Sequence, residues 1–163
     1  MKNYFKEVSS IIKEQNFEKL NDLKITKPEY FNWVTEVFEG IHVKERPNKT
    51  ALLWTDGSNT KEYSFLTLQN KANQLVNFLR RKKIVKGDII LTQLMLQPIN
   101  WYATLATIKG GFQMIPTATI MGSQDLAYRF NKTMPKVIIS DLENACKTEE
   151  AEKLCNTTIP VKI

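Results

Sequence analysis

The 163-residue sequence lacks long apolar runs: no stretch of about 18 apolar residues, the length that a membrane-spanning helix needs, is present. Its start, MKNYFKEVSSIIKEQ, also lacks the apolar core of about 7–15 residues that a secretory signal peptide requires. These two absences predict a cytoplasmic protein without a membrane span.

Cysteine and histidine are scarce. The two cysteines, Cys146 and Cys155, form no CxxC pair, and we interpret them as reduced thiols rather than as a disulfide. The single histidine, His42, lies far from both in the sequence, which argues against a zinc site. We therefore predict no metal site. His42 itself is expected to be a surface or half-buried residue, because no partner is evident near it.

Common catalytic motifs are also missing. The sequence contains neither G-x-x-x-x-G-K-[ST] nor G-x-G-x-x-G, so none of its six glycines forms a known phosphate loop, and G-x-S-x-G is absent. Asp88 and Asp141 fall at predicted strand ends, where we interpret them as turn or cap residues rather than as an acid/base pair. No catalytic residue is predicted in this chain.

The net charge of +6 raises the question of nucleic acid. Basic residues are spread along the chain, and the one tight run, residues 80–83, falls where a helix is predicted to end. Cations are favourable there because they interact with the helix dipole. We favour this interpretation over a nucleic-acid patch, and predict no nucleic-acid partner.

In the first half of the sequence, apolar residues recur first at helical spacing and then in alternation with polar residues. Apolar stripes predict one helix over residues 4–15 and another from Pro28 to just before Pro47. The segments TALLWTD and KEYSF, separated by DGSN, predict a β-hairpin, and Ser64 would cap the helix that follows. The residues of the three predicted stripes are Phe5, Val8 and Ile12; Phe31, Val34, Phe38 and Ile41; and Leu68, Ala72, Leu75 and Leu79.

From residue 88 onward, short and nearly all-apolar strands alternate with helices in the order β-α-β-α-β-α-β. This pattern is typical of a parallel sheet buried on both faces. The predicted fold class is therefore α/β, a mainly parallel sheet with helices on both faces in three layers, preceded by a β-hairpin and N-terminal helices.

The stretch PTATIMGSQDLAYRF, residues 116–130, contains the best candidate site. The strand FQMIP leads into residues 117–121, and the next helix would begin at Ser123, whose side chain would cap it. Ligands of open parallel sheets gather beyond the carboxyl ends of the strands, and helix N-termini favour phosphate. Asp125 in the first turn weighs against an anion, and a plain connection between strand and helix remains the alternative.

Five segments in order resemble the N-terminal part of AMP-forming acyl-CoA synthetases, in the branch of the medium-chain acyl-CoA and acetyl-CoA enzymes. The segments are RPNKTALLW, YSFLTL, KGD, GFQMIP and SQDLAYR. The resemblance implies an adenylate-forming ligase that uses ATP, Mg²⁺, CoA and a carboxylic acid. It also implies that the loop contributes to the CoA nucleotide site through Ala118, Thr119 and Ile120. Relatives often have Gly where Thr117 stands and some have Gln where Ile120 stands.

The phosphate loop, adenine-binding motif, ribose-binding Asp and catalytic Lys of such enzymes lie further along their sequences. The resemblance thus implies an N-terminal fragment that is inactive alone and binds no cofactor firmly. Residues 1–27 would form a helical extension, and residues 28–163 the first part of the enzyme's N-terminal domain. Self-association through the truncated sheet would follow. The alternative is a free-standing α/β module that binds a nucleotide or a partner.

Overall fold

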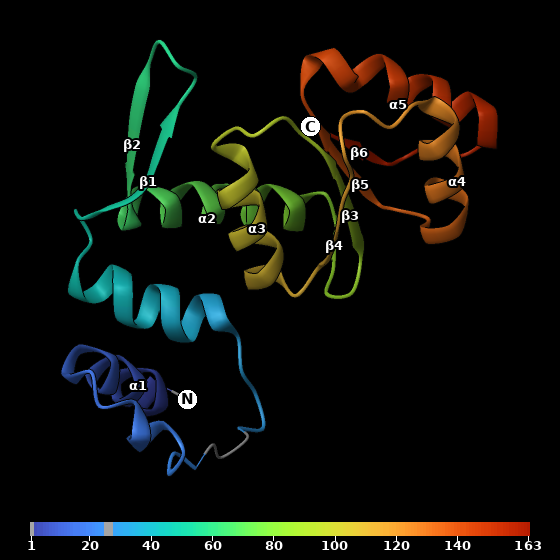
Figure 1. Cartoon of the computed structure of the whole chain (residues 1–163). Helices are drawn as coiled ribbons and strands as arrows, with labels where there is room; N and C mark the ends of the chain where they lie inside the picture. Colours follow the sequence, from blue (N-terminus) through green and yellow to red (C-terminus); the bar gives the residue numbers. More distant parts are fainter. Residues whose placement is uncertain (1, 25–27) are drawn as a thin grey trace.

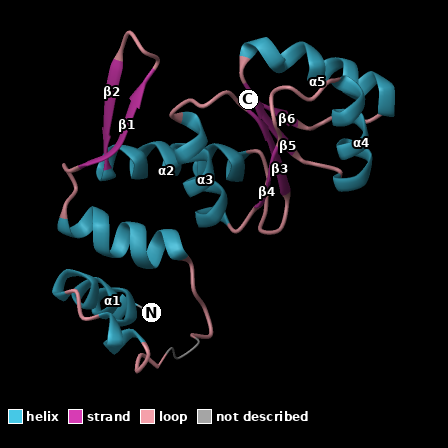
Figure 2. Cartoon of the chain, viewed as in Figure 1, coloured by secondary structure: helices cyan, strands magenta, loops and turns pink. Residues whose placement is uncertain are grey.

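The computed structural model describes residues 2–24 and 28–163 (Figure 1). The N-terminal helices and a β-hairpin lie on one side, and the parallel sheet with its helices lies on the other (Figure 2). The helices α2 (Phe65–Arg81) and α3 (Ile99–Gly110) lie between these two parts and contact both of them.

The four-stranded sheet is entirely parallel, with strand order β4-β3-β5-β6. Helices α3, α4 and α5 connect successive strands, which confirms the predicted alternation of strand and helix. The bounds of the remaining elements are β3 (Ile89–Gln93), β4 (Gln113–Pro116), α4 (Ser123–Thr133), β5 (Val137–Ser140), α5 (Leu142–Cys155) and β6 (Val161–Lys162).

Helices cover both faces of this sheet because neighbouring strand residues point in opposite directions. Ile90 belongs to the same buried cluster as Leu79 of α2 and Ala103 of α3. Leu91, its neighbour in β3, instead belongs to a cluster with Leu126 and Phe130 of α4. All six side chains are fully buried. The predicted three-layer α/β fold is therefore confirmed.

The hairpin consists of β1 (Thr50–Thr55) and β2 (Thr60–Ser64), which pair antiparallel as a sheet of their own. Its turn is closed by Asp56, whose Oδ1 accepts hydrogen bonds from the backbone N–H groups of Ser58 (2.9 Å) and Asn59 (2.7 Å). Gly57 has a φ of 93°, which a residue without a Cβ adopts readily. The segment DGSN therefore forms the predicted turn.

The hairpin leads directly into α2. The Oγ of Ser64 accepts a hydrogen bond from the N–H of Thr67 at 3.1 Å, which confirms the predicted cap. The buried stripe of α2 consists of Leu68, Ala72, Val76 and Leu79, and Leu75 is only half-buried. Val76 takes its place because a stripe on a 3.6-residue helix drifts around the axis.

The second N-terminal helix does not start at Pro28 as predicted. Helix η2 (Val34–Val43), with π-type hydrogen bonds, begins later, because the side chain of Asn32 satisfies its first N–H groups. The Oδ1 of Asn32 accepts from Val34 N (3.1 Å) and Thr35 N (3.3 Å). Phe31 consequently lies outside the helix and is 40% exposed, so it is not a member of the buried stripe.

Helix α1 (Lys2–Glu14) and the short η1 (Phe17–Leu20) precede η2. Ile11 of α1 is buried, whereas Ile12, which the sequence placed in the stripe, is 53% exposed. Ile11, three residues after Val8, lies on the same face of the helix as Val8, whereas Ile12, four residues after it, lies outside that face. The rings of Phe5 and Phe31 stack 6.3 Å apart, which attaches α1 to the segment before η2.

Candidate functional site

The 117–121 loop lies at the carboxyl edge of the parallel sheet, between β4 and α4 (Figure 1). Its first residue still belongs to the pairing of the strands, since Thr117 N donates to Thr92 O at 2.7 Å. A turn closes the loop, with Met121 N donating to Ala118 O at 3.1 Å. The strand FQMIP thus places the loop where the sequence predicted it.

Gln93, the last residue of β3, lies under this loop and is fully buried. Its Nε2 donates to two loop carbonyls, Ala118 O at 3.3 Å and Met121 O at 3.1 Å. These two carbonyls therefore point toward the sheet. Sequence reasoning missed Gln93; the only signal was a polar residue ending an otherwise apolar strand.

Lys147 of α5 holds the middle of the loop. Its Nζ donates to Thr119 O at 2.7 Å and to the Oδ1 of Asn144 at 2.8 Å. Asn144 is buried and donates in turn to the Oδ1 of Asp141 at 2.6 Å. Asp141 also accepts from Asn144 N, which makes it the N-cap of α5 and confirms that it is a cap residue. Three loop carbonyls thus have side-chain donors from β3 and α5.

The predicted contact residues face outward to different degrees. Ile120 is 91% exposed, Ala118 is exposed and Thr119 is half-buried. Thr117 is buried, and its Oγ1, like the Oε1 of Gln93, has no hydrogen-bond partner within the described residues. The structure therefore leaves Ala118, Thr119 and Ile120 accessible to a ligand.

The start of α4 differs from the prediction. Its N-cap is Gly122, and Ser123 is the first helical residue, so its hydroxyl does not cap the helix. That hydroxyl instead hydrogen-bonds to the Oε2 of Glu150 at 2.6 Å. Glu150 and Asp125 together place two carboxylates near the helix start, which opposes a phosphate at this position.

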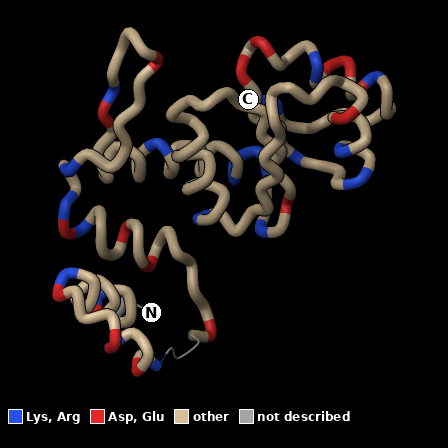
Figure 3. The backbone as a smooth tube through the Cα atoms, viewed as in Figure 1, with Lys and Arg blue, Asp and Glu red and all other residues tan. Residues whose placement is uncertain are grey.

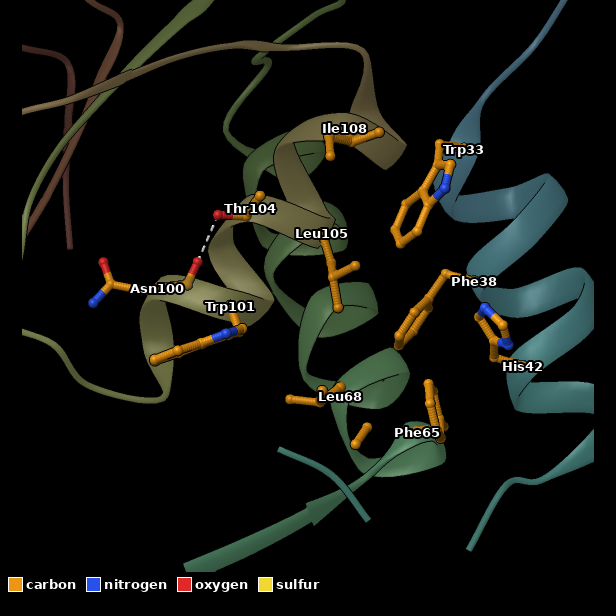
Figure 4. Close-up of a pocket in the computed structure, with 11 residues that line it drawn as sticks. Trp33, Phe38, His42, Phe65, Leu68, Asn100, Trp101, Thr104, Leu105 and Ile108 are labelled. Carbon is orange, nitrogen blue, oxygen red and sulfur yellow. Dashed lines mark hydrogen bonds between the residues drawn. The ribbon is translucent and has the colours of Figure 1, made fainter. Parts of the chain in front are cut away.

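A separate pocket of about 610 Å³ opens between η2, α2 and α3 (Figure 4). Four of its eleven lining residues are aromatic, and His42 lies at one end. The pKa of His42 is lowered, first by its partial burial and then by the nearby Arg46 guanidinium. His42 was predicted to be a surface or half-buried residue, and it is half-buried. Its partner was missed: Arg46 lies one helical turn on and approaches Nδ1 at 2.8 Å. The lining aromatic residues are Trp33, Phe38, Phe65 and Trp101.

The remaining chemistry-bearing residues do not converge. Within residues 2–24 and 28–163, no group of three His, Cys, Asp or Glu side chains could hold a metal ion, and no helix could cross a membrane. Both cysteines are free thiols. Basic and acidic residues are interspersed along the backbone (Figure 3), and residues 80–83 cover the end of α2 as predicted. Asp88 accepts from Val85 N at 2.8 Å and is a turn residue.

The architecture defines the class of an open, mainly parallel α/β sheet, in which ligands sit beyond the carboxyl ends of the strands. Residues 41–162 match the family of AMP-binding enzymes, and the chain belongs to this family. The resemblance stated from the sequence is confirmed.

Two curated relatives and one solved structure illustrate the match. The chain is 43% identical over 123 residues to 4-hydroxybutyrate–CoA ligase 1 of Metallosphaera sedula, covering 74% of this chain. It is 32% identical over 134 residues to the mitochondrial acyl-coenzyme A synthetase ACSM3 of Rattus norvegicus, covering 77%. Acetoacetyl-CoA synthetase from Streptomyces lividans superposes with a TM-score of 0.70 at 21% identity, over 80% of this chain.

This chain is much shorter than these proteins. It spans 22% of the Metallosphaera ligase, 23% of the rat synthetase and 22% of the Streptomyces chain. The alternative prediction, a free-standing α/β module that binds a nucleotide or a partner, is not favoured by the family match.

Proposed function

We propose that this chain is the N-terminal part of an AMP-forming acyl-CoA ligase. The observation that carries this proposal is the family match over residues 41–162, together with the 43% identity to a CoA ligase. In the proposed reaction, a carboxylate oxygen attacks the α-phosphorus of ATP and releases pyrophosphate. The thiol of CoA then attacks the acyl carbon, and AMP leaves as the thioester forms. The first carboxylate to test is 4-hydroxybutyrate, the substrate in the Metallosphaera enzyme's name.

We propose that the centre for the ATP and Mg²⁺ chemistry lies outside this segment. The described residues contain no acidic cluster for a metal, and the sequence contains no glycine-rich phosphate loop. We accordingly assign no catalytic residue and no metal ligand here. In our proposal those groups belong to regions that the longer relatives possess.

The proposed role of the 117–121 loop is to contact the nucleotide portion of CoA. Its position at the carboxyl edge supports this role. The three carbonyls held by Gln93 and Lys147 turn inward, so the loop offers N–H groups and the side chains of Ala118 and Ile120 to a ligand. Contacts of this kind are few, and we expect half-saturation on the order of a millimolar, near −4 kcal/mol.

A CoA titration of the ¹⁵N-labelled chain tests the loop assignment. We expect the amide signals of Ala118, Thr119 and Ile120 to shift, and adenosine, which has no phosphates, to reproduce part of the change. Pyrophosphate alone serves as the charge control. If CoA and pyrophosphate both shift only residues 80–83, simple charge attraction explains the binding and the loop assignment is wrong.

A chimaera tests the ligase assignment directly. The matching segment of the Metallosphaera ligase is replaced by the corresponding residues of this chain, and thioester formation from ATP, CoA and 4-hydroxybutyrate is measured. We expect activity to be retained within about tenfold. A folded chimaera that still forms the acyl-adenylate but never the thioester would contradict the proposed CoA role.

We also propose that residues 1–27 are an extension packed on residues 28–163. The family match begins at residue 41, and the contacts from α1 include an ion pair of 3.2 Å between Lys6 and Glu45. The boundary itself falls beside residues 25–27, which lie outside the described residues. Deleting residues 1–27 should leave the amide spectrum of the parallel sheet intact, and collapse of that spectrum would contradict the division.

A further inference from the structure

We propose that Gln93 and Lys147 are positioning residues that fix the orientation of the 117–121 loop toward CoA. This inference rests on the proposed function of the loop. Neither residue touches the ligand in this proposal. Both act through the loop backbone, by holding its carbonyl oxygens toward the sheet.

Gln93 is an unusual residue for its position. A fully buried side-chain amide in a central parallel strand is unfavourable unless its polar atoms are hydrogen-bonded. The two N–H groups of its side-chain amide donate to Ala118 O and Met121 O, at the two ends of the loop turn. The flipped amide would place an oxygen against two carbonyl oxygens, so this orientation is chemically fixed.

Lys147 supplies the third contact from a different element. Its ammonium reaches Thr119 O, in the middle of the loop, from α5. Asn144 also accepts from that ammonium and is itself held by the N-cap Asp141. The start of α5 thus fixes the position of the Lys147 ammonium. Gln93 and Lys147 both belong to regular secondary structure, β3 and α5.

The consequence is electrostatic. A peptide unit whose carbonyl points inward points its N–H outward, and an outward N–H attracts the electronegative atoms of a nucleotide. If these carbonyls were released, they would turn toward solvent and present negative dipole ends to an anionic ligand. Gln93 and Lys147 therefore decide which backbone groups the loop offers to a ligand, because their side chains hold its carbonyls from the side of the sheet and α5.

The test uses the complete 163-residue chain in the CoA titration described above. Gln93→Met and Lys147→Met keep the side-chain length but remove the donors. We expect each to raise the CoA concentration at half-saturation about five- to tenfold. Lys147→Arg, which keeps a donor, should restore most of the affinity. Lys153→Met changes an exposed lysine of the same helix and should have no effect.

The outcomes separate the two proposals. If CoA shifts no loop amide signal in the unaltered chain, the proposed CoA function is overturned, and the positioning role with it. A second outcome would overturn the positioning role alone. In it, CoA shifts the loop amides of both the unaltered chain and the folded Lys147→Met variant, with the same CoA concentration at half-saturation. Lys147→Met keeps the test decisive if Gln93→Met fails to fold. Failure of Lys147→Arg to restore affinity while its spectrum matches the unaltered chain would also contradict the role.

Discussion

Lys109, near the end of α3, forms an ion pair of 2.5 Å with Glu39 of η2, and both side chains are about four-fifths buried. The same ammonium donates to the Oδ1 of Asn73 on α2. One side chain thereby joins three helices, and it connects the N-terminal helical part to the parallel sheet domain.

We predict that Lys109→Met lowers the free energy of unfolding by about 1–3 kcal/mol, because it leaves the Glu39 carboxylate without its charged partner in a mostly buried position. Urea denaturation measures the change. Lys71→Met, at an exposed lysine of α2, is the control. The double variant Lys109→Met/Glu39→Gln should lose less than the sum of the two single changes, and strict additivity would mean that the pair is not coupled.

A second prediction concerns pH. Because burial and Arg46 lower the folded-state pKa of His42 below its usual value of 6.5, the folded chain prefers the neutral ring. The resulting stability is present above about pH 6.5 and is lost as the pH falls through the folded-state pKa. Urea denaturation at pH 7.5 and pH 5 should therefore show a smaller difference for His42→Gln than for the unaltered chain. Arg46→Gln removes only the second cause and should give an intermediate difference. If the free energy of unfolding depends equally on pH in all three proteins, His42 does not cause the pH dependence.

The helix cap at Ser64 gives a third prediction. Ser64→Ala removes the acceptor for Thr67 N and should destabilise the chain by about 1 kcal/mol. Ser58→Ala, in the exposed hairpin turn, is the matched control and should change stability by less than about 0.5 kcal/mol. Thermal unfolding of the two variants side by side distinguishes them. A loss of equal size in both would mean that the cap contributes nothing of its own.

A fourth prediction concerns catalysis. The 163-residue chain should show no carboxylate-dependent exchange of labelled pyrophosphate into ATP, because it contains no phosphate loop. The exchange assay is run with 4-hydroxybutyrate, and a boiled sample is the control. Turnover clearly above the boiled sample would refute the proposal that adenylation needs further parts of a ligase.

The fifth prediction is self-association beside β6, one of the two edge strands of the parallel sheet. Leu142 is 91% exposed and Ile163 is 39% exposed, and both line a pocket of about 420 Å³ at this edge. Exposed edges and apolar patches tend to pair with copies of themselves. Sedimentation should show association that increases with concentration. Leu142→Glu should weaken it, whereas Leu154→Glu, at another exposed leucine of α5, should not. A monomeric profile at all concentrations would count against it.

Local patterns in the sequence were sufficient for much of the fold. The alternation of apolar strands with helices determined the three-layer sheet, because an apolar strand between helices must be covered on both faces. Ser64 and Asp141 were identifiable as cap or turn residues because capping depends on contacts within about four residues. The same reasoning failed at Ser123 by one position, since Gly122 also fits an N-cap and only the backbone distinguishes them.

The contacts that hold the candidate site were decided by tertiary structure alone. Gln93 and Ala118 are 25 residues apart in the chain, and Lys147 and Thr119 are 28 apart. Periodicity describes which face of an element a residue occupies, but it carries no information about the register between β3 and β4 or the distance from α5 to the loop. The sequence by itself therefore determined the layers, the caps and the place of the loop. The orientation of its carbonyls depends on side chains that only the packing of the sheet and α5 brings beneath it.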